Sequence, residues 1–168
     1  MEGKLTTDGI INSLGSKGVR GSRKKVVIVD DNASYLSIVR TLLKPFYDTY
    51  PAPSGEKLLQ IMENFIPDMI LLDIEMPEMS GFETINIIKE NPRFKDVPIV
   101  FITAKDDEYS AVKGLSLGAV DYVTKPFSGP LLLRRISNLL MVEQLKRELQ
   151  ESQAEVKQLR AELDSRDL

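Results

Sequence analysis

The chain has 168 residues, a formal net charge of −3 and 42% hydrophobic residues, which is ordinary for a globular protein. Its length suffices for one well-buried domain with a remainder, but not for two domains of usual size. The sequence has no cysteine and no histidine, which excludes disulfides, zinc–thiolate sites, Ser–His catalysis and imidazole metal ligands. The acidic net charge argues against direct nucleic-acid binding, which needs a basic face.

Two features bear on location. No apolar run approaches the roughly 20 residues that a membrane-spanning helix needs, and the N-terminal residues lack the apolar core of a signal peptide. A cytoplasmic protein that does not contact a membrane is therefore expected. Residues 1–22 are rich in glycine, serine and lysine without a sustained period, which predicts a flexible N-terminal arm.

Alternating strand and helix signals follow. Apolar runs bounded by breakers predict strands buried on both faces, and a weaker strand carries Pro51 with Pro53 just beyond it, which confines that strand to a sheet edge. Apolar residues at helical spacing predict helices, two of them capped by Asn32 and Ser54 and a fourth beginning at Asp106 or Asp107. The apolar series of the first helix is Tyr35, Leu36, Val39, Leu42 and Leu43. The predicted strands are 25–31, 47–52, 68–73, 98–103 and 120–124.

Five strands that alternate with five helices predict a parallel sheet with right-handed crossovers. The edge-confined second strand favours the strand order 2-1-3-4-5. The fold class is therefore α/β, a flavodoxin-like doubly wound sheet whose last helix extends into a coiled coil.

The coiled-coil prediction rests on residues 142–168. Apolar residues there recur at alternating steps of three and four, with Ser152 at one d position. Glu155 at g could meet Arg160 at e of a second chain, so a parallel homodimer is the preferred interpretation, and a single solvated helix is the alternative. The seam residues are Val142, Leu145, Leu149, Ser152, Val156, Leu159 and Leu163.

Polar side chains stand at the C-terminal ends of four neighbouring strands. Asp30 and Asp31 follow the first, and Asp73, Thr103 and Lys125 end or follow the others. Strands about 4.8 Å apart bring three carboxylates together, which requires cationic compensation. Lys125 supplies one charge, and all-oxygen ligands predict Mg²⁺ or Mn²⁺ for the rest.

A carboxylate beside a divalent cation, a lysine and a hydroxyl is equipped to attack a phosphoryl group. We therefore predict that Asp73 is the nucleophile, that Lys125 neutralises the equatorial oxygens and that Thr103 hydrogen-bonds one of them. The product would be an aspartyl phosphate.

The region from about Lys24 to Leu140 resembles the receiver domain of two-component response regulators. The resemblance implies that Asp73 accepts the phosphoryl group of a sensor histidine kinase and that Asp30, Asp31, Asp73 and the backbone carbonyl of Glu75 hold the metal. The matching motifs are Val26–Asp31, Leu72–Pro77 with Met79 and Gly81, Ile102–Ala104, and Gly118–Phe127.

The same resemblance gives roles to residues of the last two strands. It implies that Lys125 contacts the phosphoryl oxygens and precedes a cis Pro126. Thr103 and Tyr122 fall where the family places its switch pair. Phosphorylation is then expected to alter the face made by the fourth helix, the last strand and the fifth helix, a further candidate dimer interface.

The predicted organisation is an arm over 1–22, a receiver domain over 23–141 and a dimerising, signalling helix over 142–168. The receiver resemblance implies a phosphorylation-dependent switch rather than an enzyme. The end of the chain, Leu163–Leu168, resembles the linker that leads into diguanylate cyclase domains, so an output of that kind is expected. One alternative is an aspartyl-nucleophile phosphohydrolase similar to the haloacid dehalogenase family, which Asp73-Ile74-Glu75 superficially resembles. Another is a stand-alone coiled-coil adaptor.

Overall fold

The structure is a computed structural model that describes residues 22–104 and 108–166. Its five strands form one parallel sheet in the order β2-β1-β3-β4-β5, which confirms the predicted α/β topology. β2 lies at the edge, where Pro51 costs the sheet little because an edge strand has one unpaired side. The strands are β1 (Lys25–Val29), β2 (Asp48–Ala52), β3 (Met69–Asp73), β4 (Ile99–Ala104) and β5 (Asp121–Lys125).

The helices begin where the sequence supplies caps. The side chain of Asn32 accepts hydrogen bonds from the backbone at the start of α2, and Ser54 does the same for α3. Ser80 and Glu83 form a reciprocal capping box on α4. The predicted start of the fourth helix lies outside the described residues, as does the predicted arm up to residue 21. The helices are α2 (Ala33–Leu43), α3 (Gly55–Asn64), α4 (Gly81–Glu90), α5 (Glu108–Ser116) and α6 (Gly129–Arg166).

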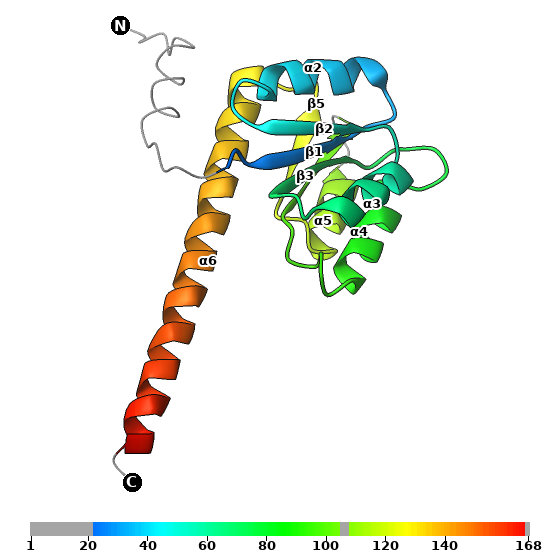
Figure 1. Ribbon diagram of the computed structural model, residues 1–168. Coiled ribbons are helices and arrows are strands. Elements are labelled where there is room, and N and C mark those ends of the chain that lie inside the picture. Colours follow the sequence, from blue (N-terminus) through cyan, green and yellow to red (C-terminus); the bar gives the residue numbers. More distant parts are fainter. Residues whose placement is uncertain (1–21, 105–107, 167–168) are drawn as a thin grey trace, which may run out of the picture. The chain divides into compact units, whose positions relative to one another are not determined.

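Helices cover both faces of the sheet, with α2 on one face and α3, α4 and α5 on the other (Figure 1). β3 lies at the centre, and all five of its residues are buried. Each buried leucine or isoleucine of this strand contributes about 1.5–3 kcal/mol to folding. The sheet can therefore present its strand ends as a rigid edge on which a site can be built.

The chain divides into two compact units, the first ending at Arg134 and the second beginning at Arg135. The division falls within α6. Apolar side chains of the second unit, from Val142 to Leu163 at the seam spacing, are 46–60% exposed. Within the described part of the chain, no helix is long and apolar enough to cross a membrane.

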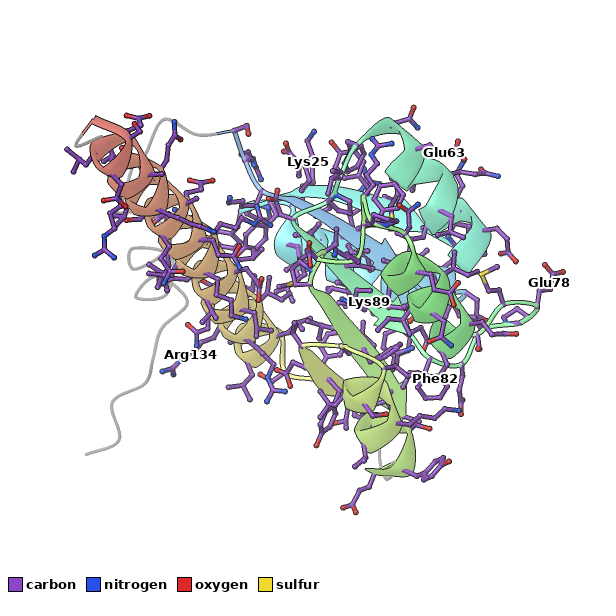
Figure 2. The ribbon with its side chains drawn as sticks, turned by 90° about the horizontal axis from the view of Figure 1, so that it is seen from below. Lys25, Glu63, Glu78, Phe82, Lys89 and Arg134 are labelled. Carbon is purple, nitrogen blue, oxygen red and sulfur yellow. The ribbon has the colours of Figure 1, made fainter. Side chains whose placement is uncertain are left out.

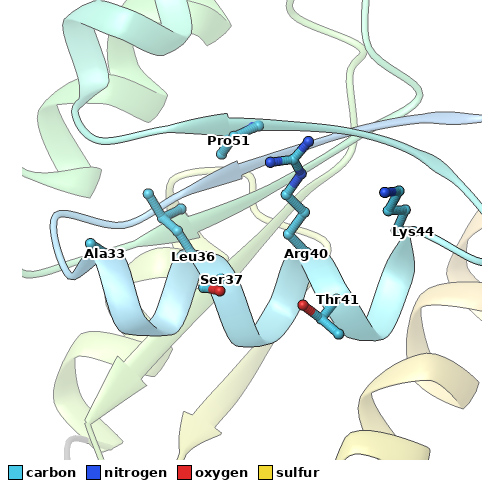
Figure 3. A pocket seen from close by; sticks show the side chains of 7 residues that line it. All are labelled: Ala33, Leu36, Ser37, Arg40, Thr41, Lys44 and Pro51. Atoms are coloured by element: carbon cyan, nitrogen blue, oxygen red, sulfur yellow. The ribbon is translucent and has the colours of Figure 1, made fainter.

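A groove of about 390 Å³ runs between α2 and the edge strand β2 (Figure 3). Arg40 and Lys44 give it a basic lining, and none of its lining residues is one of the acids at the strand ends. The groove is thus separate from the acidic cluster. Its lining residues are Ala33, Leu36, Ser37, Arg40, Thr41, Lys44 and Pro51.

Candidate functional site

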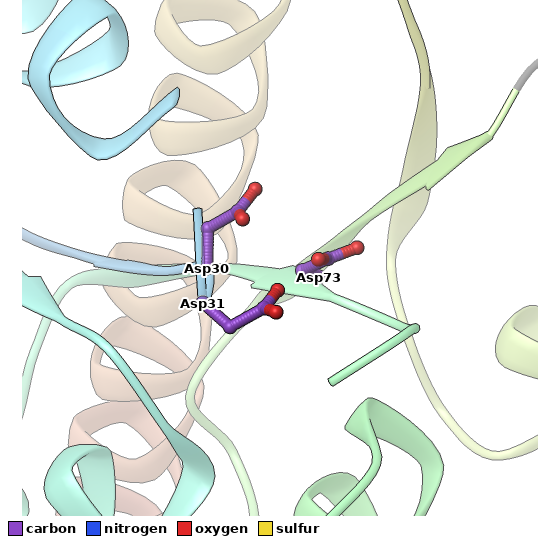
Figure 4. A group of neighbouring side chains, drawn as sticks. All are labelled: Asp30, Asp31 and Asp73. Atoms are coloured by element: carbon purple, nitrogen blue, oxygen red, sulfur yellow. The ribbon is translucent and has the colours of Figure 1, made fainter. Parts of the chain in front are cut away.

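Three carboxylates meet at the C-terminal edge of the sheet (Figure 4). Asp30 and Asp31 follow β1, and Asp73 ends the neighbouring strand β3. Each can offer one oxygen such that these oxygens lie within 4.8 Å of one another. Asp30 and Asp73 are only 2% and 6% exposed, whereas Asp31 is open to solvent. The strand-end acids identified in the sequence are therefore brought together.

The turn after β1 fixes Asp30 through local hydrogen bonds. The Asp30 backbone N–H donates to the Ala52 carbonyl at 3.1 Å, which extends the pairing with β2 by one residue. The Asn32 N–H donates to Asp30 Oδ1 at 2.8 Å. Because Asn32 also caps α2, the carboxylate and the helix start are held by one short segment.

The loop after β3 is folded tightly against Asp73. The Ile74 N–H donates to the Ile102 carbonyl at 3.2 Å, and the Gly81 N–H donates to the Ile74 carbonyl at 2.9 Å. A Cβ atom at Gly81 would lie 2.4 Å from the Asp73 carbonyl oxygen, so only glycine allows this approach. Glu78, which projects from the loop (Figure 2), turns the chain with a φ of 67°.

Lys125 at the end of β5 joins two of the acids. Its Nζ lies 2.6 Å from Asp30 Oδ2 and 3.5 Å from Asp73 Oδ2. Burial alone would lower the pKa of Lys125, but the hydrogen bond to Asp30 and the charges of Asp73 and Asp30 outweigh that effect and raise the pKa. The lysine therefore carries its positive charge at neutral pH.

Asp73 has an unusual environment for an aspartate. Burial raises its pKa to about 6, and the charge of Asp30 adds to the rise, as does Asp31 to a smaller extent. Lys125 and a hydrogen bond from the Glu75 backbone oppose the rise without cancelling it. The carboxylate is thus short of positive charge, and an added cation would stabilise its ionised form.

Thr103 and Tyr122 lie on neighbouring strands. Thr103 is 2% exposed, and its hydroxyl donates to the Ala104 carbonyl at 3.2 Å. Tyr122 is half-buried and packs against the core. Its register partner Phe101 is two residues from Thr103, so the two predicted switch side chains share one face of the sheet.

Two further side chains border the site. The ring of Tyr35, in the first turn of α2, has its centroid 4.2 Å from Lys125 Nζ. The same ring packs against Phe127 with 6.3 Å between centroids. In the sequence, Tyr35 is recognisable only as one of the apolar residues of its helix. The available signal was an aromatic residue in the first turn after the acid pair.

The comparisons with known proteins identify the family. The model of the response regulator receiver domain matches residues 26–137. The chain belongs to this family. Receiver domains act in phosphorylation-dependent signalling, take phosphoryl groups from sensor histidine kinases and bind Mg²⁺ at an acidic pocket. This receiver has an acidic cluster of Asp30, Asp31 and Asp73.

Known relatives and structures agree with this assignment. A Vibrio cholerae protein named "Probable cyclic di-GMP phosphodiesterase" is 43% identical over 68% of this chain, which spans 26% of that protein. The Bacillus subtilis regulator PhoP, of alkaline phosphatase synthesis, is 37% identical over 70% of this chain and 48% of its own. The structure of Vibrio cholerae CheY4 covers 70% of this chain and 98% of its own with a TM-score of 0.65 and 28% identity.

The receiver occupies only part of the longer relatives. The chain spans 26%, 13% and 8% of three of the curated proteins it matches. The second of these is named a sensor histidine kinase and the third a hybrid signal transduction histidine kinase.

The peptide bond between Lys125 and Pro126 is cis in this receiver, as the resemblance implied.

Proposed function

We propose that this receiver stores a phosphoryl group on Asp73 and thereby switches the state of its C-terminal helix. The observation that carries the proposal is the environment of Asp73. Asp73 is a buried carboxylate at the end of the central strand. The carboxylates of Asp30 and Asp31 lie beside it, and the Lys125 ammonium is 3.5 Å from its Oδ2. An arrangement of this kind concentrates the groups that phosphoryl transfer needs and excludes bulk water.

The donor is the phosphohistidine of a sensor kinase. A carboxylate oxygen of Asp73 attacks the phosphorus, the new P–O bond forms, and the P–N bond breaks with its electron pair returning to the imidazole nitrogen. Lys125 neutralises charge on the phosphoryl oxygens, and the Thr103 hydroxyl turns from the Ala104 carbonyl to donate to one of them. Later attack of water on the phosphorus regenerates the carboxylate.

A magnesium ion completes the site in this proposal. The carboxylates of Asp30, Asp31 and Asp73 and the backbone carbonyl of Glu75 would hold it. These are all oxygen donors, which fits Mg²⁺ or Mn²⁺. The raised pKa of Asp73 supports the same conclusion, because the carboxylate lacks full compensation from protein groups alone. When bound, the ion supplies positive charge for the phosphoryl oxygens.

Signal output is proposed to pass through α6. The exposed apolar seam between Val142 and Leu163 supports a parallel homodimer in which a phosphorylation-dependent rotation shifts one helix against the other. Thr103 and Tyr122 would start this change at the face of α5, β5 and α6. An output domain acting on cyclic di-GMP is supported by the terminal sequence, which resembles linkers of diguanylate cyclases, and by the name of the Vibrio cholerae relative.

Phosphorylation with a small donor tests the central claim. Acetyl phosphate and Mg²⁺ should add one acid-stable, base-labile phosphate per chain, measured by intact mass. Asp73→Asn should abolish the modification, whereas Asp96→Asn, at an exposed aspartate between α4 and β4, should leave it unchanged. Labelling that survives Asp73→Asn would refute the assignment. Sustained turnover of a phosphate ester well beyond one equivalent would instead indicate a phosphohydrolase.

A further inference from the structure

The ammonium of Lys125 is held from more than one side. Asp30 and Asp73 attract it at 2.6 and 3.5 Å, and the face of the Tyr35 ring lies against it with the centroid 4.2 Å away. This distance is within the roughly 6 Å over which a cation is attracted to an aromatic ring. The side chain of Lys125 is only 18% exposed, and partial desolvation strengthens such an attraction.

The placement of Tyr35 is fixed by the same segment that positions the acids. Asn32 Oδ1 accepts a hydrogen bond from the Tyr35 backbone N–H at 3.3 Å, while the Asn32 N–H donates to Asp30. The backbone of Tyr35 and the Asp30 carboxylate are therefore coupled through one capping residue. On the ring side, Phe127 packs at 6.3 Å between centroids, which is within the usual range for aromatic pairs.

A purely structural role explains Tyr35 less well. Val39 and Leu43 follow it at steps of four on α2, and both are fully buried in the core. Tyr35 continues this stripe but is only half-buried, because its ring reaches past the core to the end of β5. An aliphatic side chain at position 35 would be enough to continue the apolar stripe. The aromatic ring instead faces the Lys125 ammonium, which packing alone does not require.

We propose that Tyr35 is a positioning residue, which holds the Lys125 ammonium toward Asp73 by a cation–π contact and so sets the rate of phosphoryl transfer. Lys125 has a flexible four-carbon stem, and the nearer carboxylate, Asp30, competes for its charge. The ring keeps the ammonium from turning into solvent. The rate effect rests on the proposed function, but the contact itself does not.

The contact has a spectroscopic signature that needs no phosphorylation. Protons on the Lys125 Cε that lie over an aromatic face are shifted upfield by the ring current, and they show nuclear Overhauser contacts to the Tyr35 ring protons. In the metal-free full chain, the shift should persist in Tyr35→Phe and disappear in Tyr35→Leu, which keeps an apolar side chain but removes the ring. Tyr109→Leu, at an exposed tyrosine of α5, is the matched control and should leave the shift unchanged.

The functional measurement uses acetyl phosphate with Mg²⁺ and the same variants. Tyr35→Leu should slow phosphorylation by about three- to tenfold, as expected for loss of a cation–π contact. Tyr35→Phe and Tyr109→Leu should stay within about twofold of the wild type, since both retain the ring that faces the lysine.

Three outcomes would overturn the proposal: an unshifted Lys125 resonance without ring contacts in the wild type, a shift that survives Tyr35→Leu, or Tyr35→Phe as slow as Tyr35→Leu. The wild-type contacts decide the point even if Tyr35→Leu does not fold. A wild type that shows the contacts yet accepts no phosphate would contradict the proposed function and leave the placement of Tyr35 intact.

Discussion

Both β3 and the second unit's part of α6 carry regularly placed apolar side chains, but those of β3 are buried and those of α6 are exposed. Every residue of β3 is buried, because β1 and β4 pair along its two edges and helices of the same chain cover both faces of the sheet. The seam residues of α6, from Val142 to Leu163, are 46–60% exposed. An exposed seam of this regularity is typical of a helix that is covered by a second chain. One region is thus complete within the chain, and the other is proposed to need a partner.

A matched pair of leucine truncations should give the largest difference between the two regions. Leu71→Ala removes a fully buried side chain from β3 and should lower the free energy of unfolding by about 3 kcal/mol. Leu149→Ala removes an exposed seam residue and should change the unfolding of dilute, monomeric chain by less than about 0.5 kcal/mol. Urea titration followed by circular dichroism measures both.

In self-association, the two leucine variants should show the reverse order of effects: Leu71→Ala should leave the association of the folded chain unchanged, and Leu149→Ala should weaken it. Leu149→Ala should weaken the dimer at least several-fold in sedimentation equilibrium, because it removes a proposed seam contact from each chain. Gln150→Ala, at the neighbouring position outside the seam, is the control. Equal association of the Leu149→Ala variant and the wild type would locate the dimer interface elsewhere.

Asp73→Asn should stabilise the metal-free protein at alkaline pH, whereas Leu71→Ala in the same strand should destabilise it. The folded-state pKa of Asp73 is about 6, against an ordinary value of 3.8. The folded state therefore binds more protons than the unfolded state between these values, and stability falls as the pH rises through that window. The loss above pH 6 is at most about 3 kcal/mol from the linkage between pKa and stability, because solvent screens part of it, and asparagine avoids it.

Thermal unfolding in EDTA at pH 4 and pH 8 measures this effect. The gain from Asp73→Asn should be small at pH 4, where the wild-type carboxyl is protonated in the fold, and largest at pH 8. Mg²⁺ should stabilise the wild type and have little effect on the variant. A variant less stable than the wild type at pH 8 would show that Asp73 is well compensated by protein groups alone.

Gly81→Ala should destabilise the edge of the sheet at the site. The new Cβ would lie 2.4 Å from the Asp73 carbonyl oxygen and 2.9 Å from Ile74 Cα, both backbone atoms that cannot move aside cheaply. The expected loss is about 2 kcal/mol, despite the better helix propensity of alanine. Asn86→Ala, at an exposed position of the same helix, should be nearly neutral in the same urea titration. Similar stabilities of the two variants would disprove the close approach.

Reversal of a charge beside the seam should produce the smallest effect. Glu155→Arg replaces the proposed attraction to Arg160 of a second chain with repulsion and should weaken the dimer by about 1 kcal/mol at low salt. Combining it with Arg160→Glu should restore association, and high salt should reduce both effects. Glu151→Arg, outside the e and g positions, is the control. If the double variant did not regain self-association, the result would argue against a parallel dimer in this register.

The sequence predicted the sheet order and the acidic edge for a simple reason. In a parallel sheet every strand ends at the same edge, so strand-end residues such as Asp73, Thr103 and Lys125 are brought near one another by topology alone. The prolines in and after β2 likewise predicted its place at the edge. Helix caps at Asn32 and Ser54 were predictable because capping depends on side chains within a few residues.

Contacts between distant segments could not be predicted in this way. Periodicity assigned Tyr35 to an apolar helix stripe, and only the packing of α2 on the sheet shows that its ring meets Lys125. Spacing could not show that Lys125 lies nearer to Asp30 than to Asp73. The close approach of Gly81 to the Asp73 carbonyl also depends on how the loop after β3 folds back.

Local periodicity and parallel topology were therefore enough to predict the α/β class, the strand order and the group of acids, hydroxyl and lysine at one edge of the sheet. The depth at which Asp73 is buried, the carboxylate nearest to Lys125 and the ring that covers Lys125 are visible only in the folded structure. These depend on packing distances of a few ångströms between segments far apart in the chain, and such distances leave no periodic trace in a sequence.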